Sequence, residues 1–166
     1  SIILIFNSTN QSSTSYFSKD WMNIMDSRIN DHLQRLNRYT IQLKEIANTD
    51  KKNFTTNDLY IAAAERYLHL AIESCLNIGN RMLSLEQFTK SLRPPESYAE
   101  IFRGLAKIEV ISVEFSEELV RMAKYRNRLV HIYWEITPEE MYDILQNRLD
   151  DFNKFMECIV KYYNSR

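Results

Sequence analysis

Apolar residues recur every three or four positions along most of the chain, and this spacing predicts amphipathic helices. A first stretch covers roughly residues 21–47, with Ile29 and Leu33 in its apolar stripe. The longest stretch, roughly residues 56–86, is apolar on two sides. Such a helix is buried between neighbours or lies at a subunit interface. Between the two stretches, the Asn-Thr-Asp sequence at 48–50 has turn chemistry, which ends the first helix.

Start and stop signals divide the second half of the chain. The proline pair at 94–95 breaks the chain, and residues 96–104 have the pattern of a short helix. Ser112 is a candidate N-cap for the helix that follows. Thr137 caps a last helix, a proline takes the first helical position, and Glu140 completes a capping box. The apolar pattern then predicts that this last helix continues to the end of the chain.

The composition favours an all-α fold in a single domain. The chain has 166 residues, of which 45% are hydrophobic, and this is enough for one packed core. It contains only two glycines and three prolines, which are too few turn residues for a sheet of short strands. The formal net charge is −1, so a nucleic-acid binder would need a local basic patch.

The first 20 residues differ from the rest of the chain. A short apolar run from Ser1 to Phe6 precedes a stretch rich in serine, threonine and asparagine. The run is too short to span a membrane, and it lacks the basic start and the cleavage site of a signal peptide. We expect residues 1–20 to be an N-terminal extension or a cloning remnant, and residues 21–166 to form one helical domain without a membrane association.

Cysteines and histidines are few and scattered. Cys75 and Cys158 lie far apart in helical patterns, where small reduced cysteines commonly pack in a core. His32, His69 and His131 form no pair with the spacing of a metal site. We therefore expect no structural metal and no cofactor.

One segment concentrates the residues that carry chemistry. Residues 121–131 contain four basic side chains, one histidine and no acid. Basic residues late in a helix suit the helix dipole, which is the purely structural explanation. Arg126 nevertheless continues an apolar stripe through Leu119 and Met122. An always charged side chain in that position needs a partner or a cleft.

The spacing of these residues limits how they can meet. Successive helical residues turn by about 100°, so Arg126 and His131 would lie about 140° apart. Asn127 and His131, four positions apart, would share a face. Either the helix breaks near His131, or a working site takes residues from a second chain. The segment that follows is short and presents Tyr133.

Several segments resemble one known family. Residues 122–133 read Met-Ala-Lys-Tyr-Arg-Asn-Arg-Leu-Val-His-Ile-Tyr, and residues 137–152 begin Thr-Pro-Glu-Glu-Met-Tyr. Residues 67–80 and 97–102 also fit, and the likeness covers about residues 25–163. The sequence is similar to the HepT family, the HEPN-domain toxins of prokaryotic toxin–antitoxin pairs, through the motif Arg-x4-His-x-Tyr. The resemblance implies a HEPN-type bundle of four main helices plus a short helix, with up-down topology.

The resemblance also implies a function. The protein would be the toxin of a type VII-like toxin–antitoxin system, a metal-independent endoribonuclease whose homodimeric cleft gathers both copies of the motif. A ribose 2′-hydroxyl would attack the adjacent phosphate of RNA, with His131 as general acid or base. Arg126 would hold the phosphate, and Asn127 would orient the histidine or the phosphate. The basic residues that would guide the RNA backbone are Arg121, Lys124 and Arg128.

Regulation at Tyr133 is a further implication of the resemblance. A cognate minimal nucleotidyltransferase antitoxin, MntA, would transfer AMP from ATP onto this tyrosine in the cytoplasm. We expect the Tyr133 side chain at the mouth of the cleft, where an adenylyl group adds bulk and negative charge. Alternatively, Tyr133 is a packing aromatic.

For the whole chain, the alternative is a non-catalytic helical partner or substrate-binding subunit of a minimal nucleotidyltransferase. A third class, a stand-alone interaction module, has no positive signal in the sequence.

Overall fold

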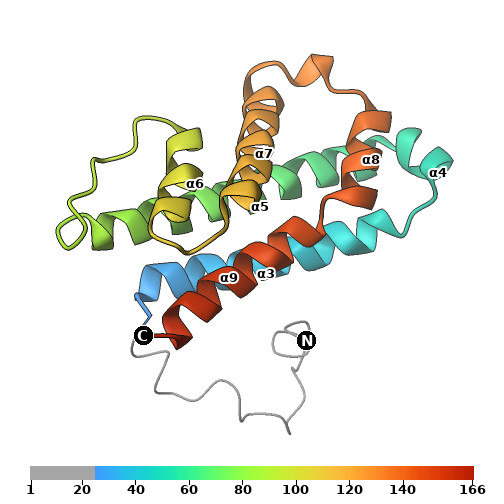
Figure 1. Ribbon diagram of the computed structural model, residues 1–166. Helices are drawn as coiled ribbons and strands as arrows, with labels where there is room; N and C mark the ends of the chain where they lie inside the picture. Colours follow the sequence, from blue (N-terminus) through green and yellow to red (C-terminus); the bar gives the residue numbers. More distant parts are fainter. Residues whose placement is uncertain (1–24) are drawn as a thin grey trace, which may run out of the picture.

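The computed structural model describes residues 25–166, except for the side chain of Tyr133 (Figure 1). The extension predicted at residues 1–20, and residues 21–24 of the predicted first helix, lie outside this described part. Every regular element of residues 25–166 is helical, as the sequence predicts. The elements are α3 (Ser27–Ala47), α4 (Lys51–Thr55), α5 (Asp58–Glu86), α6 (Tyr98–Lys107), α7 (Val113–His131), the 3-10 turn η1 (Tyr133–Glu135), α8 (Pro138–Asn147) and α9 (Asp150–Asn164).

Two long antiparallel helices, α3 and α5, form the centre of the bundle (Figure 1). α9 lies beside α3, whereas α6 and α7 pack against each other and against α5. α4 and α8 pack together at the end of the bundle where α3 leads into α5. This arrangement confirms the predicted all-α bundle.

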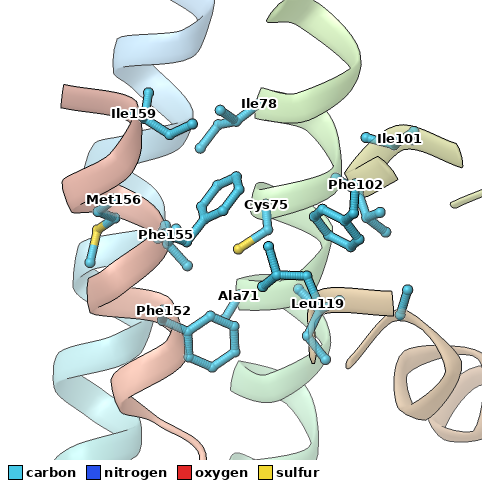
Figure 2. Close-up of a cluster of buried hydrophobic side chains, with 14 of the residues drawn as sticks. Ala71, Cys75, Ile78, Ile101, Phe102, Leu119, Phe152, Phe155, Met156 and Ile159 are labelled. Carbon is cyan, nitrogen blue, oxygen red and sulfur yellow. The ribbon is translucent and has the colours of Figure 1, made fainter. Parts of the chain in front are cut away.

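One hydrophobic core joins α5, α6, α7 and α9 (Figure 2). Ala71 and Cys75 of α5 meet Phe102 of α6, Leu119 of α7 and Phe155 of α9, and each of these residues is 0% exposed. The rings of Phe102 and Phe155 meet edge to face, with centroids 6.3 Å apart. Burial raises the pKa of the Cys75 thiol, as expected for a reduced core cysteine. α5 is apolar on two sides because it is buried between these neighbours.

Polar side chains determine where most of the helices begin. The first amides of a helix have no partner within the helix, and a side-chain oxygen just before it can accept from them. The described caps of this kind are Asp26, Asp50, Asn57, Ser97, Ser112 and Thr137. The caps at Ser112 and Thr137 confirm the sequence prediction. α3 begins at Ser27 rather than near residue 21, because Asp26 has a non-helical backbone (φ −53°, ψ 132°) and caps the helix.

Two further features of the helices differ from the sequence prediction. α4 forms one short turn after the first helix, and it is held by Phe54, which is 0% exposed. The predicted last helix is two helices, because the backbone leaves the helical region at Arg148 (φ −122°, ψ −4°). No glycine or proline marks this bend between residues 139 and 166. Arg148 pairs locally with Asp151 on α9 and also with Glu118, 30 positions away on α7, so a distant contact helps to hold the bend.

The two glycines of the chain lie where α5 and α6 cross, and not in turns. A Cβ on Gly79 would stand 2.6 Å from Cγ2 of Ile101, and a Cβ on Gly104 would stand 2.8 Å from Cδ1 of Leu83. Both distances are shorter than a van der Waals contact, so the missing side chains allow the two helices to approach closely. This crossing determines the place of α6, which begins at Tyr98.

Candidate active site

The motif arginine and histidine lie on one unbroken helix, α7. Ser112 caps its start by accepting from the amide of Phe115 at 3.1 Å. The helix continues to His131, and the backbone leaves it at Ile132 (φ −140°, ψ 38°). Arg126 and His131 therefore stay about 140° apart around the helix axis. Because α7 does not break before His131, this helix does not bring the two side chains together within one chain.

The guanidinium of Arg126 is packed against two other helices. Only 13% of the side chain is exposed. Its Nε and Nη2 atoms donate to Oε2 of Glu73 on α5, at 3.1 and 2.8 Å. The ring of Tyr98 on α6 lies against it, with 5.3 Å between Cζ and the ring centroid. These contacts supply the partner that an arginine in an apolar stripe requires.

Asn127 and His131 lie on an open part of α7. Ser116 and Ala123, on the same stripe as Asn127, are buried, and α6 packs against α7. α7 is longer than α6 and extends beyond it (Figure 1). Beyond α6 the stripe is uncovered: Asn127 and His131 are exposed, and Val130 is 39% exposed. The two polar residues of the motif are thus accessible from solvent.

Arg128 fastens the end of α7 to α8. Its Nη1 and Nη2 atoms donate to the two carboxylate oxygens of Glu140, at 2.5 and 3.0 Å. This ion pair raises the pKa of Arg128. Thr137 Oγ1 accepts from the Glu140 amide at 3.1 Å, so the predicted cap is present. The Glu140 carboxylate binds Arg128 instead of completing the predicted capping box.

The residues predicted to guide RNA, Arg121, Lys124 and Arg128, line one surface pocket of about 370 Å³ between α5, α7, α8 and α9. Apolar side chains form most of its walls. Arg121 is exposed and pairs with Glu118, and Lys124 is exposed. Arg121 and Arg126 lie about 140° apart around α7. The structure thus brings the three predicted RNA-guiding residues together, but on another side of the helix from Arg126.

Glu73 and Tyr98 are the residues of this site that the sequence interpretation missed. The charges along the predicted helix at 56–86, Glu73 among them, are from the sequence either surface ion pairs or interface contacts. The sequence signal was on one side only, because Arg126 continues an apolar stripe whereas Glu73 has the polar His69 and Asn77 as helical neighbours. His69 Nε2 also lies 3.8 Å from Oε2 of Glu73. Burial and then the charge of Arg126 lower the pKa of His69, so its imidazole is neutral near pH 7.

Tyr133 lies two residues after His131, at the start of η1. The amide of Glu135 donates to the carbonyl of Ile132 at 2.9 Å, which closes this turn. The predicted placement of the Tyr133 side chain at a cleft mouth lies outside the described part of the structure.

Within residues 25–166, no group of three or more His, Cys, Asp or Glu side chains is placed to hold a metal ion. In the same part of the chain, no helix has both the length and the hydropathy needed to cross a membrane.

Comparison with known proteins identifies the family. A sequence model described as "Ribonuclease HepT-like" matches residues 29–159, which is most of the chain. The mRNA nuclease HepT of Shewanella oneidensis is 30% identical over 109 residues, which cover 66% of this chain and 76% of that protein. The tRNA nuclease HepT of Aphanizomenon flos-aquae is 25% identical over 140 residues, which cover 84% and 92%. The chain belongs to the HepT-like ribonuclease family.

Solved structures share the fold. One is the Shewanella oneidensis HEPN toxin, tri-AMPylated and in complex with an MNT antitoxin, with a TM-score of 0.74 and 23% identity over 82% of this chain and 99% of that chain. Another is YutE of Bacillus subtilis, described as a cytosolic protein, with a TM-score of 0.70 and 24% identity over 84% and 90%. The protein is an endoribonuclease of this family, with the fold of the solved HEPN toxin. The alternative of a non-catalytic nucleotidyltransferase subunit gains no support from these relatives.

Proposed function

We propose that this toxin cleaves RNA at a site built from Arg126, Asn127 and His131. The observation that carries the proposal is the placement of Arg126. Its guanidinium is held by Glu73 of α5 and Tyr98 of α6, and its own helix, α7, presents the exposed His131 at its end. A fixed guanidinium binds a phosphate and stabilises the charge that develops on it during cleavage.

A homodimer is the working unit in this proposal. Within one chain, Arg126 and His131 lie about 140° apart on α7. The stripe that contains Asn127 and Val130 is uncovered. A second copy packed on this stripe would bury Val130 and bring two motif helices together. The cleft between the copies would then contain two arginines and two histidines.

The proposed reaction begins with attack of the ribose 2′-hydroxyl on the adjacent phosphorus. One His131 imidazole takes the hydroxyl proton as the new 2′-O–P bond forms. The P–O5′ bond breaks, and the leaving oxygen receives a proton from His131 of the partner subunit. The products are a 2′,3′-cyclic phosphate and a 5′-hydroxyl end. Each proton transfer of this kind is worth about 10²–10⁴ in rate, and no step needs a metal ion.

In the proposed site, Arg126 donates to the non-bridging oxygens of the phosphate, and Asn127 orients the imidazole or the phosphate. Arg121, Lys124 and Arg128 form a basic surface on another side of α7 from Arg126, and this surface attracts the RNA backbone in a salt-dependent way.

Regulation in the proposal takes place at Tyr133. A relative with the same fold has been solved in a tri-AMPylated form in complex with an MNT antitoxin. By extension, a cognate MntA antitoxin in the cytoplasm would transfer AMP from ATP to the Tyr133 hydroxyl, with release of pyrophosphate. The added phosphate, two residues after His131, would compete with RNA for Arg128 and Lys124.

Expression toxicity and RNA cleavage test the catalytic assignment. Arg126→Ala and His131→Ala should abolish both, while circular dichroism shows the same helix content as wild type. Wild-type cleavage should generate 5′-hydroxyl ends and should persist in EDTA. Full RNA cleavage by the His131→Ala protein would contradict the assignment, and so would a wild-type cleavage activity that EDTA removes.

The modification has a separate test. The toxin is co-expressed with the nucleotidyltransferase encoded beside it, and its intact mass is measured. Wild type should gain one or more AMP groups, whereas Tyr133→Phe should gain none and stay toxic. A Tyr133→Phe toxin that is modified and silenced like wild type would exclude Tyr133 as the regulatory residue.

A further inference from the structure

We propose that Glu73 is a positioning residue for the cleavage reaction. Together with Tyr98, it holds the guanidinium of Arg126 so that the Nη1–Nη2 edge faces the scissile phosphate. This inference rests on the proposed role of Arg126. It extends the site from the motif helix α7 to residues of α5 and α6.

The hydrogen bonds to Glu73 occupy one side of the guanidinium. A guanidinium has five N–H donors, with one pair along its Nε–Nη2 side and another along its Nη1–Nη2 end. Oε2 of Glu73 accepts from Nε at 3.1 Å and from Nη2 at 2.8 Å. Among the described residues, no hydrogen bond uses Nη1 of Arg126. The end of the guanidinium is therefore available for two parallel hydrogen bonds to a phosphate.

Tyr98 fixes the plane of the same group. Its ring centroid lies 5.3 Å from Cζ of Arg126, within the range of a cation–π contact. Tyr98 is the first residue of α6, which the glycine crossing with α5 holds in place. Glu73 restrains the guanidinium within its plane, and Tyr98 restrains it from one face. An arginine held in this way has little rotamer freedom left to lose when a phosphate binds.

Glu73 forms its hydrogen bonds with Arg126 and not with His69. His69 Nε2 lies 3.8 Å from Oε2 of Glu73, which is beyond hydrogen-bond distance. Burial and Arg126 lower the pKa of His69, so the imidazole is neutral near pH 7 and does not compete as a cation.

Removal of the carboxylate should slow the reaction more than it weakens RNA binding. In Glu73→Ala the guanidinium can adopt other rotamers, and a misplacement of about 1 Å can cost about 100-fold in rate. We expect kcat to fall about 10- to 100-fold, with a smaller change in KM. Glu73→Gln keeps an acceptor oxygen and should lose less activity than Glu73→Ala. Glu73→Asp keeps the charge and should retain part of the activity.

The experiment is a double-mutant cycle between positions 73 and 126. Total RNA from the expression host serves as substrate, and new 5′-hydroxyl ends are counted by kinase labelling over a range of RNA concentrations. Glu73→Ala is compared in wild type and in Arg126→Lys, whose ammonium cannot form the same two bonds. The loss of cleavage rate caused by Glu73→Ala should be much smaller in the Arg126→Lys background. Glu117→Gln is the matched control, because it removes a carboxylate that binds Arg103 through two hydrogen bonds, at 2.7 and 3.0 Å, away from the motif.

Two results would overturn the inference. Faster cleavage by Glu73→Ala would mean that the carboxylate sequesters Arg126. An equal loss in both backgrounds would mean that Glu73 acts independently of Arg126. Failure of the proposed function is a different result, in which wild type produces no 5′-hydroxyl ends or Arg126→Ala cleaves like wild type. The melting temperature of each variant separates a loss of fold from a loss of positioning.

Discussion

At the scale of single residues, the cations of α7 differ in the partners they have. Arg126 binds Glu73, and Arg128 binds Glu140, each on another helix. Lys124 is exposed. A cation in a two-bond ion pair between helices adds to stability besides any part it has in RNA binding, whereas an exposed cation acts on phosphate alone, over a distance that salt shortens.

Lys124→Ala and Arg128→Ala should therefore have different effects. Lys124→Ala should weaken RNA binding and reduce the slope of log K against log salt by about 1, without a change in stability. Arg128→Ala should lower the free energy of unfolding by about 1 kcal/mol, because Arg128 and Glu140 are both 35% exposed and solvent screens the pair. Filter binding by the His131→Ala protein at several salt concentrations, and urea unfolding, measure the two effects. Identical salt slopes for the His131→Ala protein with and without Lys124→Ala would contradict the first expectation.

At the scale of elements, the crossing of α5 and α6 depends on residues without side chains. Alanine in place of glycine usually stabilises a helix by up to about 1 kcal/mol. At Gly79 the added Cβ would meet Cγ2 of Ile101, a branch at a stiff β-carbon. At Gly104 it would meet the end of Leu83, which can turn away. The two substitutions should therefore differ.

Gly79→Ala should destabilise the protein by about 1–3 kcal/mol, as overpacking does, while Gly104→Ala should be close to neutral. Thermal and urea unfolding of the two variants provide a matched comparison. Because α6 carries Tyr98, Gly79→Ala should also lower the cleavage rate at a temperature where it is still folded. A Gly79→Ala protein as stable as wild type would show that the helices can separate at no cost.

The start of α3 is linked to α5 through Asp26. Its Oδ1 accepts from the amides of Arg28 and Ile29, and its Oδ2 accepts from Arg81 at 2.6 Å. The hydrogen bond from Arg81 holds the pKa of Asp26 below its ordinary value of 3.8. A lowered carboxyl pKa contributes stability that is present above the ordinary value and is lost as pH falls through the folded value.

Asp26→Asn keeps the cap but removes the charge. Wild type should exceed this variant in free energy of unfolding by about 1 kcal/mol at pH 7. The difference should shrink as the pH falls below 3.8. Urea unfolding of both proteins at neutral and acid pH measures it, and a difference that does not change with pH would assign the effect to something other than the Asp26 charge.

At the scale of the whole molecule, the proposed homodimer follows from the uncovered stripe of α7 and from the separation of Arg126 from His131. Wild type should be a dimer by light scattering at micromolar concentration, and Val130→Glu should shift it toward monomer, because a charge would be buried at the contact. A monomeric wild type would contradict a shared cleft.

The sequence predicted the helical class and many details of the helices. Helical periodicity and capping depend on residues within a few positions of each other, so Ser112 and Thr137 could be assigned as caps from the sequence alone. The candidate segment was also local, since Arg126 and His131 lie five positions apart. Two other local features were not predicted. α3 begins at its own cap, Asp26, and α4 was missed because a single turn is too short to show a helical pattern.

Only the tertiary structure decided which residues meet. Glu73 lies 53 positions before Arg126, and no local pattern pairs them or places Tyr98 against the guanidinium. The bend at Arg148 has no glycine or proline to announce it, and the glycine crossing shows its role only when two helices touch. By itself, the sequence determined the helices and the motif they carry, because those are properties of neighbouring residues. The packing of distant helices decided how the arginine is held, because burial and ion pairing act between segments that are close only in the folded chain.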